Sequence, residues 1–372
     1  MGEDQSEIAI CEMMKAGVLT FHNSLNCGAV LQAYALQTIL QRLGVKVYVL
    51  DFLRKRDNVK CFSAESLSAL YHSLRRLVLE RIRIGKYARF RRRVLNLTRT
   101  IRASDQMPTE FDVFLVGSDQ VWNPVNNERN MHFFLDFVPC GKKRIAYAAS
   151  CGAKSFPTDY EDQMKPLLGK FNAISVREQE AIPMLERLTG LSPSLVCDPS
   201  LLLDAEDYLR IASARRQVKE PYVCVYVIGQ HGKALAIARN IADRIGVRRI
   251  VILGNRRAEW RLPDVGREKN VYMYGPSEFL RYVSDAEFVV TNSFHGTAFS
   301  LVFNKEFVSA LNGTEGDGRM LTLLDRVGLR SRALLPTWKG LPEAAIDYNK
   351  VVGRLGVLRA ESLMFLKEAL EL

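Results

Sequence analysis

The chain has 372 residues, enough for two domains, and its 48% apolar and 25% charged content is that of an ordinary globular protein. No apolar run approaches the roughly 18 residues that span a bilayer, and the acidic N-terminus lacks the features of a secretory signal, so we expect a cytoplasmic protein. The seven cysteines form no Cys-x-x-Cys pair, which favours reduced thiols. No Cys/His cluster has zinc spacing, so no metal is predicted.

The first predicted elements form a strand–loop–helix–strand unit. Residues 16–21 are a short apolar strand and residues 22–28 a polar loop. Residues 29–43 are an amphipathic helix ended by Gly44, and residues 45–50 are the next strand. This order is a βαβ unit, as found in parallel sheets. The loop lacks a G-x-G-x-x-G pattern, so no dinucleotide cofactor is indicated.

Residues 75–102 carry most of the net charge of +11, since eleven Lys and Arg stand against one acid, Glu80. Apolar residues recur there at near-helical spacing, which predicts a basic amphipathic helix or helix pair. Such a face is most often simply solvated. The sharper interpretations are an anionic membrane surface, with the protein peripheral at its inner face, and nucleic acid. We rank nucleic acid last and predict no such partner, because no binding motif and no interleaved stacking aromatics occur.

Four further strands of the first half end at small or polar residues. The carboxyl ends of parallel strands lie at one edge of a sheet, where α/β folds bind ligands, so these loops are expected to share a polar site. The strands and the residues that follow them are 111–116 with Gly117, Ser118, Asp119, Gln120, Val121, Trp122, Asn123 and Pro124; 144–149 with Ser150; 173–176 with Arg177 and Glu178; and 195–197 with Asp198.

A polar and charged stretch at residues 204–221 predicts a domain boundary. Strands and helices alternate again beyond it, which predicts an α/β protein with two Rossmann-like doubly wound domains facing a cleft, residues 8–203 and 220–350. A last helix, residues 354–372, is expected to cross back to the first domain. The strands of the second domain are expected at 222–228, 249–253, 287–291 and 305–311, and its helices at 232–245, 277–283, 298–303 and 317–327.

A single histidine, His295, lies between a predicted buried strand at residues 286–290 and the helical pattern of residues 298–303. The free N–H groups and the dipole of a helix start favour an anion at such a junction. Its neighbours Ser293 and Gly296 are small, as a tight turn requires. His295 could equally cap or pack the turn, and the junction alone does not separate the two interpretations.

The polar strand ends together suit a small polyanion and a polyhydroxylated acceptor better than an apolar ligand. Arg177 could grip a carboxylate or phosphate with two hydrogen bonds, or form a salt bridge with Glu178. Asp119 could act as a general base or cap its turn. Trp122 could offer a flat face to a sugar ring or pack in the core.

Six segments in chain order carry a resemblance: residues 17–35 (GVLTFHNSLNCGAVLQAYA), 117–124 (GSDQVWNP), 146–152, 175–178, 198–199 and 291–299 (TNSFHGTAF). Each motif alone is weak, but six in order are specific. Together they resemble the polysaccharide pyruvyl transferase family, and the similarity extends from about residue 16 to residue 330.

The resemblance implies a fold like that of the two-domain GT-B glycosyltransferases. It also implies transfer of pyruvate from phosphoenolpyruvate onto two hydroxyls of a sugar in a cell-surface or exopolysaccharide glycan, giving a ketal and phosphate. Phosphoenolpyruvate would be a co-substrate, with no cofactor or metal, and the acceptor a sugar or a lipid-linked glycan. His295 would protonate the enol carbon or the leaving phosphate, and Asp119 would orient or deprotonate the acceptor hydroxyl.

These roles divide the site between the two domains, with the donor on the side of the second and the acceptor on that of the first. Two other functions stay open: a GT-B glycosyltransferase that uses a nucleotide sugar, and a non-catalytic scaffold of a glycan assembly system. The residues expected to bind the donor are Arg177, Ser293, His295, Gly296 and Thr297. Those expected to bind the acceptor are Asn23, Asn26, Gly28, Ser118, Gln120, Trp122, Asn123 and Ser150.

Overall fold

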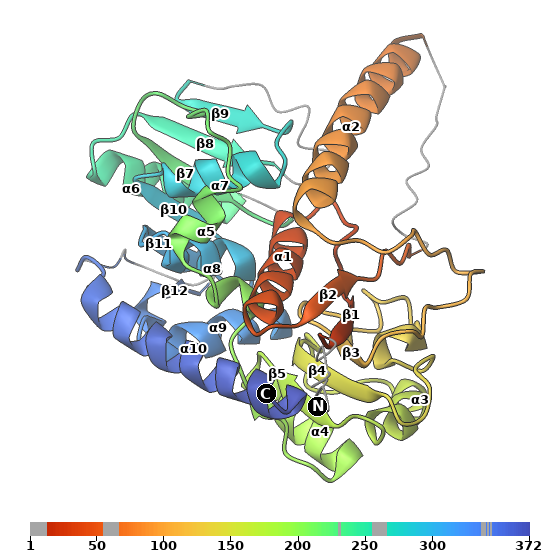
Figure 1. The fold of residues 1–372 in the computed structure, drawn as a ribbon. Coiled ribbons are helices and arrows are strands. Elements are labelled where there is room, and N and C mark those ends of the chain that lie inside the picture. Colours follow the sequence, from red (N-terminus) through yellow and green to blue (C-terminus); the bar gives the residue numbers. More distant parts are fainter. Residues whose placement is uncertain are drawn as a thin grey trace, which may run out of the picture.

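The computed structural model describes residues 13–54, 67–229, 232–254, 266–335, 340, 342 and 344–372, and for residues 67–77 it describes the backbone alone. Within these residues the strands form two six-stranded sheets in which the paired strands run parallel. Figure 1 shows the two sheets as separate units flanked by helices. The predicted class, α/β with two Rossmann-like domains, is confirmed.

The first sheet has the strand order β2-β1-β3-β4-β5-β6. Its side chains alternate between two cores, because Val113 and Leu115 pack with α1 whereas Phe114 and Val116 pack on the side of α3 and α4. The strands are β1 Lys15–Leu19, β2 Lys46–Val49, β3 Val113–Val116, β4 Lys143–Ala149, β5 Ala173–Val176 and β6 Ser194–Leu195; the helices are α1 Cys27–Arg42, α2 Leu67–Val94, α3 Thr158–Leu168, α4 Ile182–Thr189 and α5 Ala205–Leu209.

The second sheet has the order β12-β11-β10-β7-β8-β9. Val223 and Val225 of its central strand pack under α6, and Tyr222 and Cys224 face the opposite core with α7 and α8. The strands are β7 Tyr222–Tyr226, β8 Arg249–Leu253, β9 Glu268–Val271, β10 Phe288–Thr291, β11 Glu306–Ala310 and β12 Ala333–Leu334; the helices are α6 Gly232–Arg244, α7 Pro276–Ser284, α8 Phe294–Val302, α9 Gly318–Arg326 and α10 Tyr348–Leu370.

One of these hydrophobic cores, the one that contains α1, α7 and α8, extends through both domains. The rings of Tyr208 in α5 and Phe299 in α8 meet edge to face at 4.9 Å inside it. Helix α10 runs from one domain to the other along one side of the molecule (Figure 1). The Tyr348 hydroxyl at its start donates to the Ser300 carbonyl of the second domain, and farther along Ser362 accepts a hydrogen bond of 2.9 Å from the Cys197 N–H of the first. The whole is a GT-B-like architecture.

Residues 75–94 of the basic segment form the later part of α2, which extends away from both sheets (Figure 1), and residues 95–102 follow the helix. Some of its positive charge holds the domains together. The Lys86 ammonium lies 2.5 Å from a carboxylate oxygen of Glu278 in α7, and Arg93 donates to Ser277 Oγ at 3.1 Å. No helix among the described residues is long and apolar enough to cross a membrane.

The predicted strands and helices occur close to their expected positions, but α3, α5, β9 and β12 were not predicted. β9, with the sequence Glu268-Lys269-Asn270-Val271, is an edge strand among the described residues, and it lacks the apolar run of a central strand because most of its residues are only half-buried. β12 has two residues, too few for a pattern. Helix α3 contains Pro166, which argues against a helix in the sequence.

Candidate active site

A cavity of about 600 Å³ lies between the two domains. It is lined by the loops that follow β1 and β3 in the first domain and β7, β10 and β11 in the second. In each sheet the strand order reverses between two of these strands, β1 and β3 in one and β7 and β10 in the other. Such switch points open a crevice at the carboxyl ends of parallel strands, where α/β proteins bind ligands. The cavity therefore joins the two places in the fold most suited to a ligand.

His295 lies at the start of α8 and lines this cavity. Ser293 caps the helix by accepting a hydrogen bond from the Gly296 N–H. Gly296 presses on the preceding strand, since a Cβ there would lie 2.1 Å from Thr291 Oγ1. On the opposite side, a Cβ at Gly28 in the first turn of α1 would lie 2.1 Å from the His295 Cγ. The two glycines thus allow the starts of α1 and α8 to hold the imidazole between the domains.

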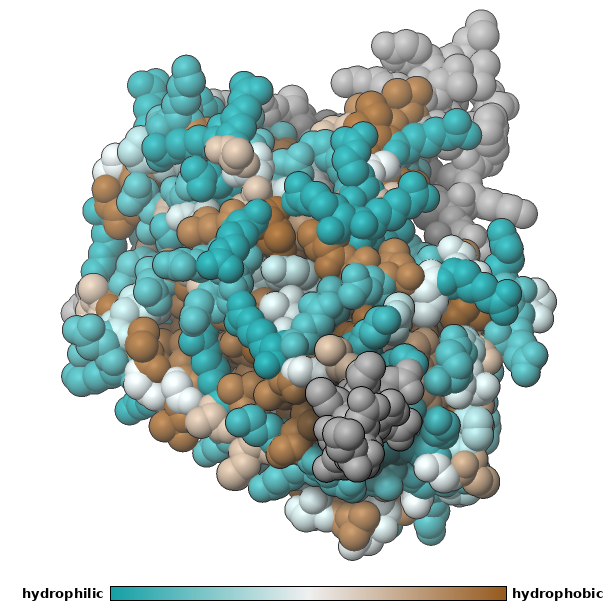
Figure 2. All heavy atoms as spheres, in the orientation of Figure 1, coloured by the Kyte–Doolittle hydropathy of each residue, from teal (hydrophilic) through white to brown (hydrophobic). Residues whose placement is uncertain are grey.

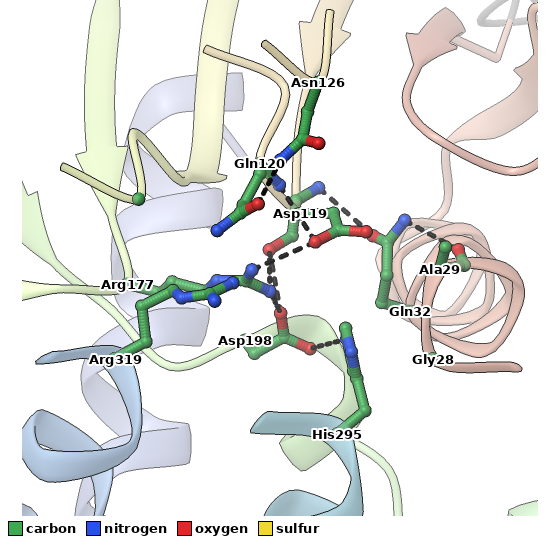
Figure 3. A network of polar contacts seen from close by, with 12 residues as sticks. Gly28, Ala29, Gln32, Asp119, Gln120, Asn126, Arg177, Asp198, His295 and Arg319 are labelled. Atoms are coloured by element: carbon green, nitrogen blue, oxygen red, sulfur yellow. Dashed lines mark hydrogen bonds and ion pairs between the residues drawn. The ribbon is translucent and has the colours of Figure 1, made fainter. Parts of the chain in front are cut away.

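The His295 side chain is buried, and its Nε2 has no hydrogen-bond partner among the described residues. Figure 3 shows the ring turned toward Asp198, whose Oδ1 lies 3.9 Å from Nε2. Burial lowers the pKa of His295 below its usual value, against the pull of the carboxylates of Asp198 and Asp119. The imidazole is therefore neutral at pH 7, with one ring nitrogen available for a proton.

A buried ion cluster stands behind His295 (Figure 3). The Arg177 guanidinium lies 2.5 Å from Asp198 Oδ2 and 3.1 Å from Asp119 Oδ1, and it stacks on the ring of Phe294 at 4.5 Å. Burial alone would raise the pKa of Asp198, but Arg177, His295 and hydrogen bonds from Ser200 lower it to about 2. Arg177 is buried and paired with two carboxylates, so it sets the charges around the cavity without lining it.

Arg319 at the start of α9 supplies a cation that lines the cavity. Within the described part of the chain it makes no ion pair, and it donates to the Gly316 carbonyl at 3.4 Å. With the Gln120 amide turned so that its oxygen faces the guanidinium, that oxygen accepts at 2.9 Å. Burial and the charge of Arg177 lower the pKa of Arg319, so the protein holds a cation there at an electrostatic cost. An anionic ligand would relieve that cost.

Asp119 provides the opposite charge at the wall of the cavity. The backbone of Asp119 is left-handed, with φ of 72°, in the loop that follows β3. Burial favours a higher pKa, but Arg177, His295 and Arg319 together hold the pKa of Asp119 below its usual value. The cavity thus offers a cation, a neutral imidazole and a carboxylate to one ligand space, which suits proton transfer next to a bound anion.

The residues predicted from the sequence fall into two groups. Those that line the cavity are Asn23, Asn26, Asp119, Gln120, Ser293 and His295. Those that lie behind it are Gly28, Ser118, Trp122, Asn123, Ser150, Arg177, Gly296 and Thr297. The second group holds the loops in shape: Ser118 donates to Asp198 Oδ2 at 2.8 Å, and Thr297 bonds Ser309 at 2.7 Å.

Trp122 is fully buried, stacks on Phe134 and donates its indole N–H to the Phe133 carbonyl at 2.9 Å. It therefore packs in the core and presents no face to a sugar in this structure. Asn123 is likewise used within its own loop, donating to the Cys151 carbonyl at 3.0 Å. Ser150 is buried and does not line the cavity. We leave these three residues out of the acceptor site.

Several lining residues were not predicted, above all Arg319, Arg54 and Asn126. Arg319 follows β11, and the polar run Asn312-Gly313-Thr314 after that strand has the same composition as the other strand ends. That signal was present in the sequence. Arg54 lies over the ring of Phe21 at 4.0 Å, a contact between distant segments that no local pattern encodes.

Thiol and metal chemistry find no support at this site. Cys27 at the start of α1 is buried against the Tyr87 hydroxyl, and burial raises its pKa to about 12. Burial also raises the pKa of Cys151 well above its usual value. Neither thiol supplies the thiolate that a nucleophile needs. The described residues contain no group of three or more His, Cys, Asp or Glu side chains arranged for a metal ion.

Solved structures with a similar fold include UDP-GlcNAc 2-epimerase from Methanocaldococcus jannaschii, at 12% identity over 93% of each chain with a TM-score of 0.48. The UDP-GlcNAc 2-epimerase from Neisseria meningitidis is similar at 11% identity, over 96% of this chain and 94% of that one, with a TM-score of 0.48. The ADP-heptose lipopolysaccharide heptosyltransferase II of E. coli is similar at 14% identity, over 94% of this chain and 99% of that one, with a TM-score of 0.38.

No curated protein matches the sequence. The model of the polysaccharide pyruvyl transferase family matches residues 26–313, from the first residue of the α1 cap to the loop after β11. The matched range contains β3, β7 and β10 of the four strands at the switch points, together with Asp119, Asp198 and His295. Since it covers well over half of the sequence, the chain belongs to the polysaccharide pyruvyl transferase family.

Proposed function

We propose that the protein transfers pyruvate from phosphoenolpyruvate onto two hydroxyls of a sugar in a cell-surface or extracellular glycan. The observation that carries the proposal is that two residues line the same cavity: His295, which is buried and neutral, and Arg319, which makes no ion pair within the described residues. Membership of the family supports the same chemistry. A cavity of about 600 Å³ has room for a small acid and one or two sugar rings.

Phosphoenolpyruvate carries a carboxylate and a phosphate close together, so its binding site needs cations and N–H donors. Arg319 would bind one of the two anionic groups with a bidentate contact. The starts of α1 and α8, which meet at Gly28 and His295, would favour the other through their dipoles. Arg177 would act on the donor indirectly, since it fixes the carboxylates of Asp119 and Asp198.

His295 would carry the proton. Arrival of the anionic donor favours the imidazolium, and Asp198, 3.9 Å from Nε2, stabilises that charge. The imidazolium would protonate the methylene carbon of the donor, which makes the adjacent carbon open to attack by an acceptor hydroxyl. Departure of phosphate and attack by the second hydroxyl complete the ketal. The proton in the new methyl group comes from the imidazolium; of the two hydroxyl protons, one returns to His295 and the other leaves on phosphate.

The acceptor would lie on the first domain's side of the cavity. Asp119 is the carboxylate there that can orient an attacking hydroxyl and accept its hydrogen bond. Asn23, Asn26 and Gln120 line the same wall and offer amide donors and acceptors to the other hydroxyls of a sugar. These uncharged groups make hydrogen bonds of fixed direction, which suits recognition of a sugar's stereochemistry.

Incubation with phosphoenolpyruvate and a panel of methyl hexosides and disaccharides tests the proposal. We expect phosphate release that depends on the acceptor, and a product with the mass of a pyruvate ketal. His295→Gln should bind phosphoenolpyruvate, seen as thermal stabilisation, and give no ketal. Stabilisation by a nucleotide sugar with none by phosphoenolpyruvate would favour the glycosyltransferase alternative. A cellular role that survives His295→Gln would favour the scaffold.

We also propose that the exposed part of α2 attaches the protein to an anionic membrane surface, which would bring it to the inner face of the membrane in the cytoplasm. Val78 and Ile82 are about half exposed, and Figure 2 shows hydrophobic side chains beside hydrophilic ones on that helix. The exposed Arg81 lies between them in the sequence. Such a face suits lipid headgroups. Sedimentation with vesicles should rise with the share of anionic lipid, and independence from lipid charge would refute the attachment.

A further inference from the structure

A second cavity of about 240 Å³ lies beside the first, and the proposed reaction gives it no role. Asn23 of the β1–α1 loop lines both cavities, so the second opens next to the acceptor side of the first. Its remaining lining comes from the end of β2 and from α2 and the chain that follows it: Asp51, Leu53, Ala88, Arg91, Arg92, Leu97 and Thr100. All of these residues precede β3, so the cavity is built by the first domain alone.

The charge in this cavity is positive. Arg91 and Arg92 contribute two guanidinium groups from one turn of α2. The single carboxylate, Asp51, is already engaged by His22 Nε2 at 2.9 Å and by the Thr100 hydroxyl at 2.7 Å. Burial favours a higher pKa for Asp51, but those hydrogen bonds and the charge of Arg91 lower it, so Asp51 stays an anion held within the protein.

Arg92 is exposed and makes no ion pair within the described part of the chain. Two arginines are suited to a phosphate ester, whose oxygens take bidentate guanidinium contacts, and Leu53 and Leu97 line the same cavity. The donor would have its own cation in Arg319 and its own N–H donors at the starts of α1 and α8, at the other cavity. A phosphate bound at Arg92 would therefore belong to the acceptor.

We infer that the acceptor is a glycosyl phosphate or diphosphate, whose sugar lies at Asp119 and whose phosphate lies between Arg91 and Arg92. This inference rests on the proposed function and specifies its acceptor class. The phosphate could be free, part of a nucleotide, or joined to a lipid, and the shared element is the phosphate on the anomeric carbon. Asn23, which lines both cavities, would contact the acceptor at the junction of sugar and phosphate.

The test compares each methyl hexoside with the matching hexose 1-phosphate as acceptor. We expect the KM of the phosphate form to be at least about tenfold lower, the contribution of one charge-assisted hydrogen bond, at a similar kcat. Arg92→Ala should abolish this difference and leave the KM for phosphoenolpyruvate unchanged. Arg89→Ala is the matched control, because it removes an exposed arginine of α2 that does not line the cavity. It should keep the difference.

Equal KM values for the two acceptor forms, or a preference that survives Arg92→Ala, would overturn the inference while the transfer reaction stands. If no acceptor is converted, the proposed function fails. Calorimetry then measures the binding of hexose 1-phosphates and still tests whether Arg92 binds a phosphate. Weaker binding in Arg92→Ala than in Arg89→Ala supports it, and equal binding refutes it. A UDP-hexose and a farnesyl diphosphate hexose, assayed in parallel, distinguish a nucleotide from a lipid source of the phosphate.

Discussion

Replacing Gly28 by alanine tests the geometry of the site with a single methyl group. A Cβ at this position would lie 2.1 Å from Cγ and 2.6 Å from Cβ of His295. Carbon atoms in contact prefer about 3.5–4.0 Å, so the ring and the backbone of α1 must separate by roughly 1.5 Å. The clash involves the root of the imidazole and not a flexible tip, so a rotamer change of His295 alone does not remove it.

A shift of about 1 Å at a reacting group can cost about a hundredfold in rate, so kcat of Gly28→Ala should fall by about that factor or more. The melting temperature should change little, because alanine favours the helix by up to about 1 kcal/mol and offsets part of the strain. Gly356→Ala in α10 is the control: a Cβ there meets nothing within 4 Å, so kcat should stay at the wild-type value. The assay is phosphate release with phosphoenolpyruvate and the best acceptor. A Gly28→Ala protein with wild-type kcat would refute the placement of His295 against α1.

Three further variants separate charge from packing. Arg319→Met should weaken phosphoenolpyruvate binding at least about tenfold and leave or raise the melting temperature, because it removes a buried cation that makes no ion pair within the described residues; a melting temperature several degrees lower would contradict this. Asp198→Asn should lower the free energy of unfolding by about 3–5 kcal/mol in urea titrations, because it leaves Arg177 buried with one carboxylate fewer. In the folded state the pKa of His295 is below its usual value, so the unfolded chain binds a proton at this residue more tightly. The neutral imidazole therefore contributes its full stability above about pH 6.5, and this contribution is lost as the pH falls through the folded pKa. Wild type should therefore lose more stability than His295→Gln between about pH 7 and pH 5, and equal losses would argue against a buried neutral imidazole.

The sequence was sufficient to predict the strands and the polar strand ends that form the site, because both depend on local patterns. Buried parallel strands are apolar throughout, and a strand that stops at Ser, Asp or His before a helical pattern identifies a ligand-binding edge. This reasoning gave the two-domain fold and brought Asp119 and His295 to one cavity. It also found Asp198 as a strand end, though without its role between Arg177 and His295.

What the sequence did not decide was which polar residues face the ligand and which face one another. Trp122 and Arg177 have the side chains of binding residues, but the Phe133 carbonyl and two carboxylates take up their hydrogen bonds. Whether such a side chain finds a hydrogen-bond partner within the protein depends on segments far apart in the chain. Arg319 is the reverse case: an ordinary residue at a helix start becomes a cation of the cavity, because it makes no ion pair within the described residues.

The central claim is tested most directly by measuring both products formed from phosphoenolpyruvate and a sugar acceptor in the presence of this protein. Phosphorus NMR follows the phosphate, and mass spectrometry of the sugar follows the pyruvate. We predict equal amounts of phosphate and of a ketal-bearing sugar, both absent with His295→Gln. Phosphate release without a ketal, or a ketal formed equally well by His295→Gln, would contradict the account.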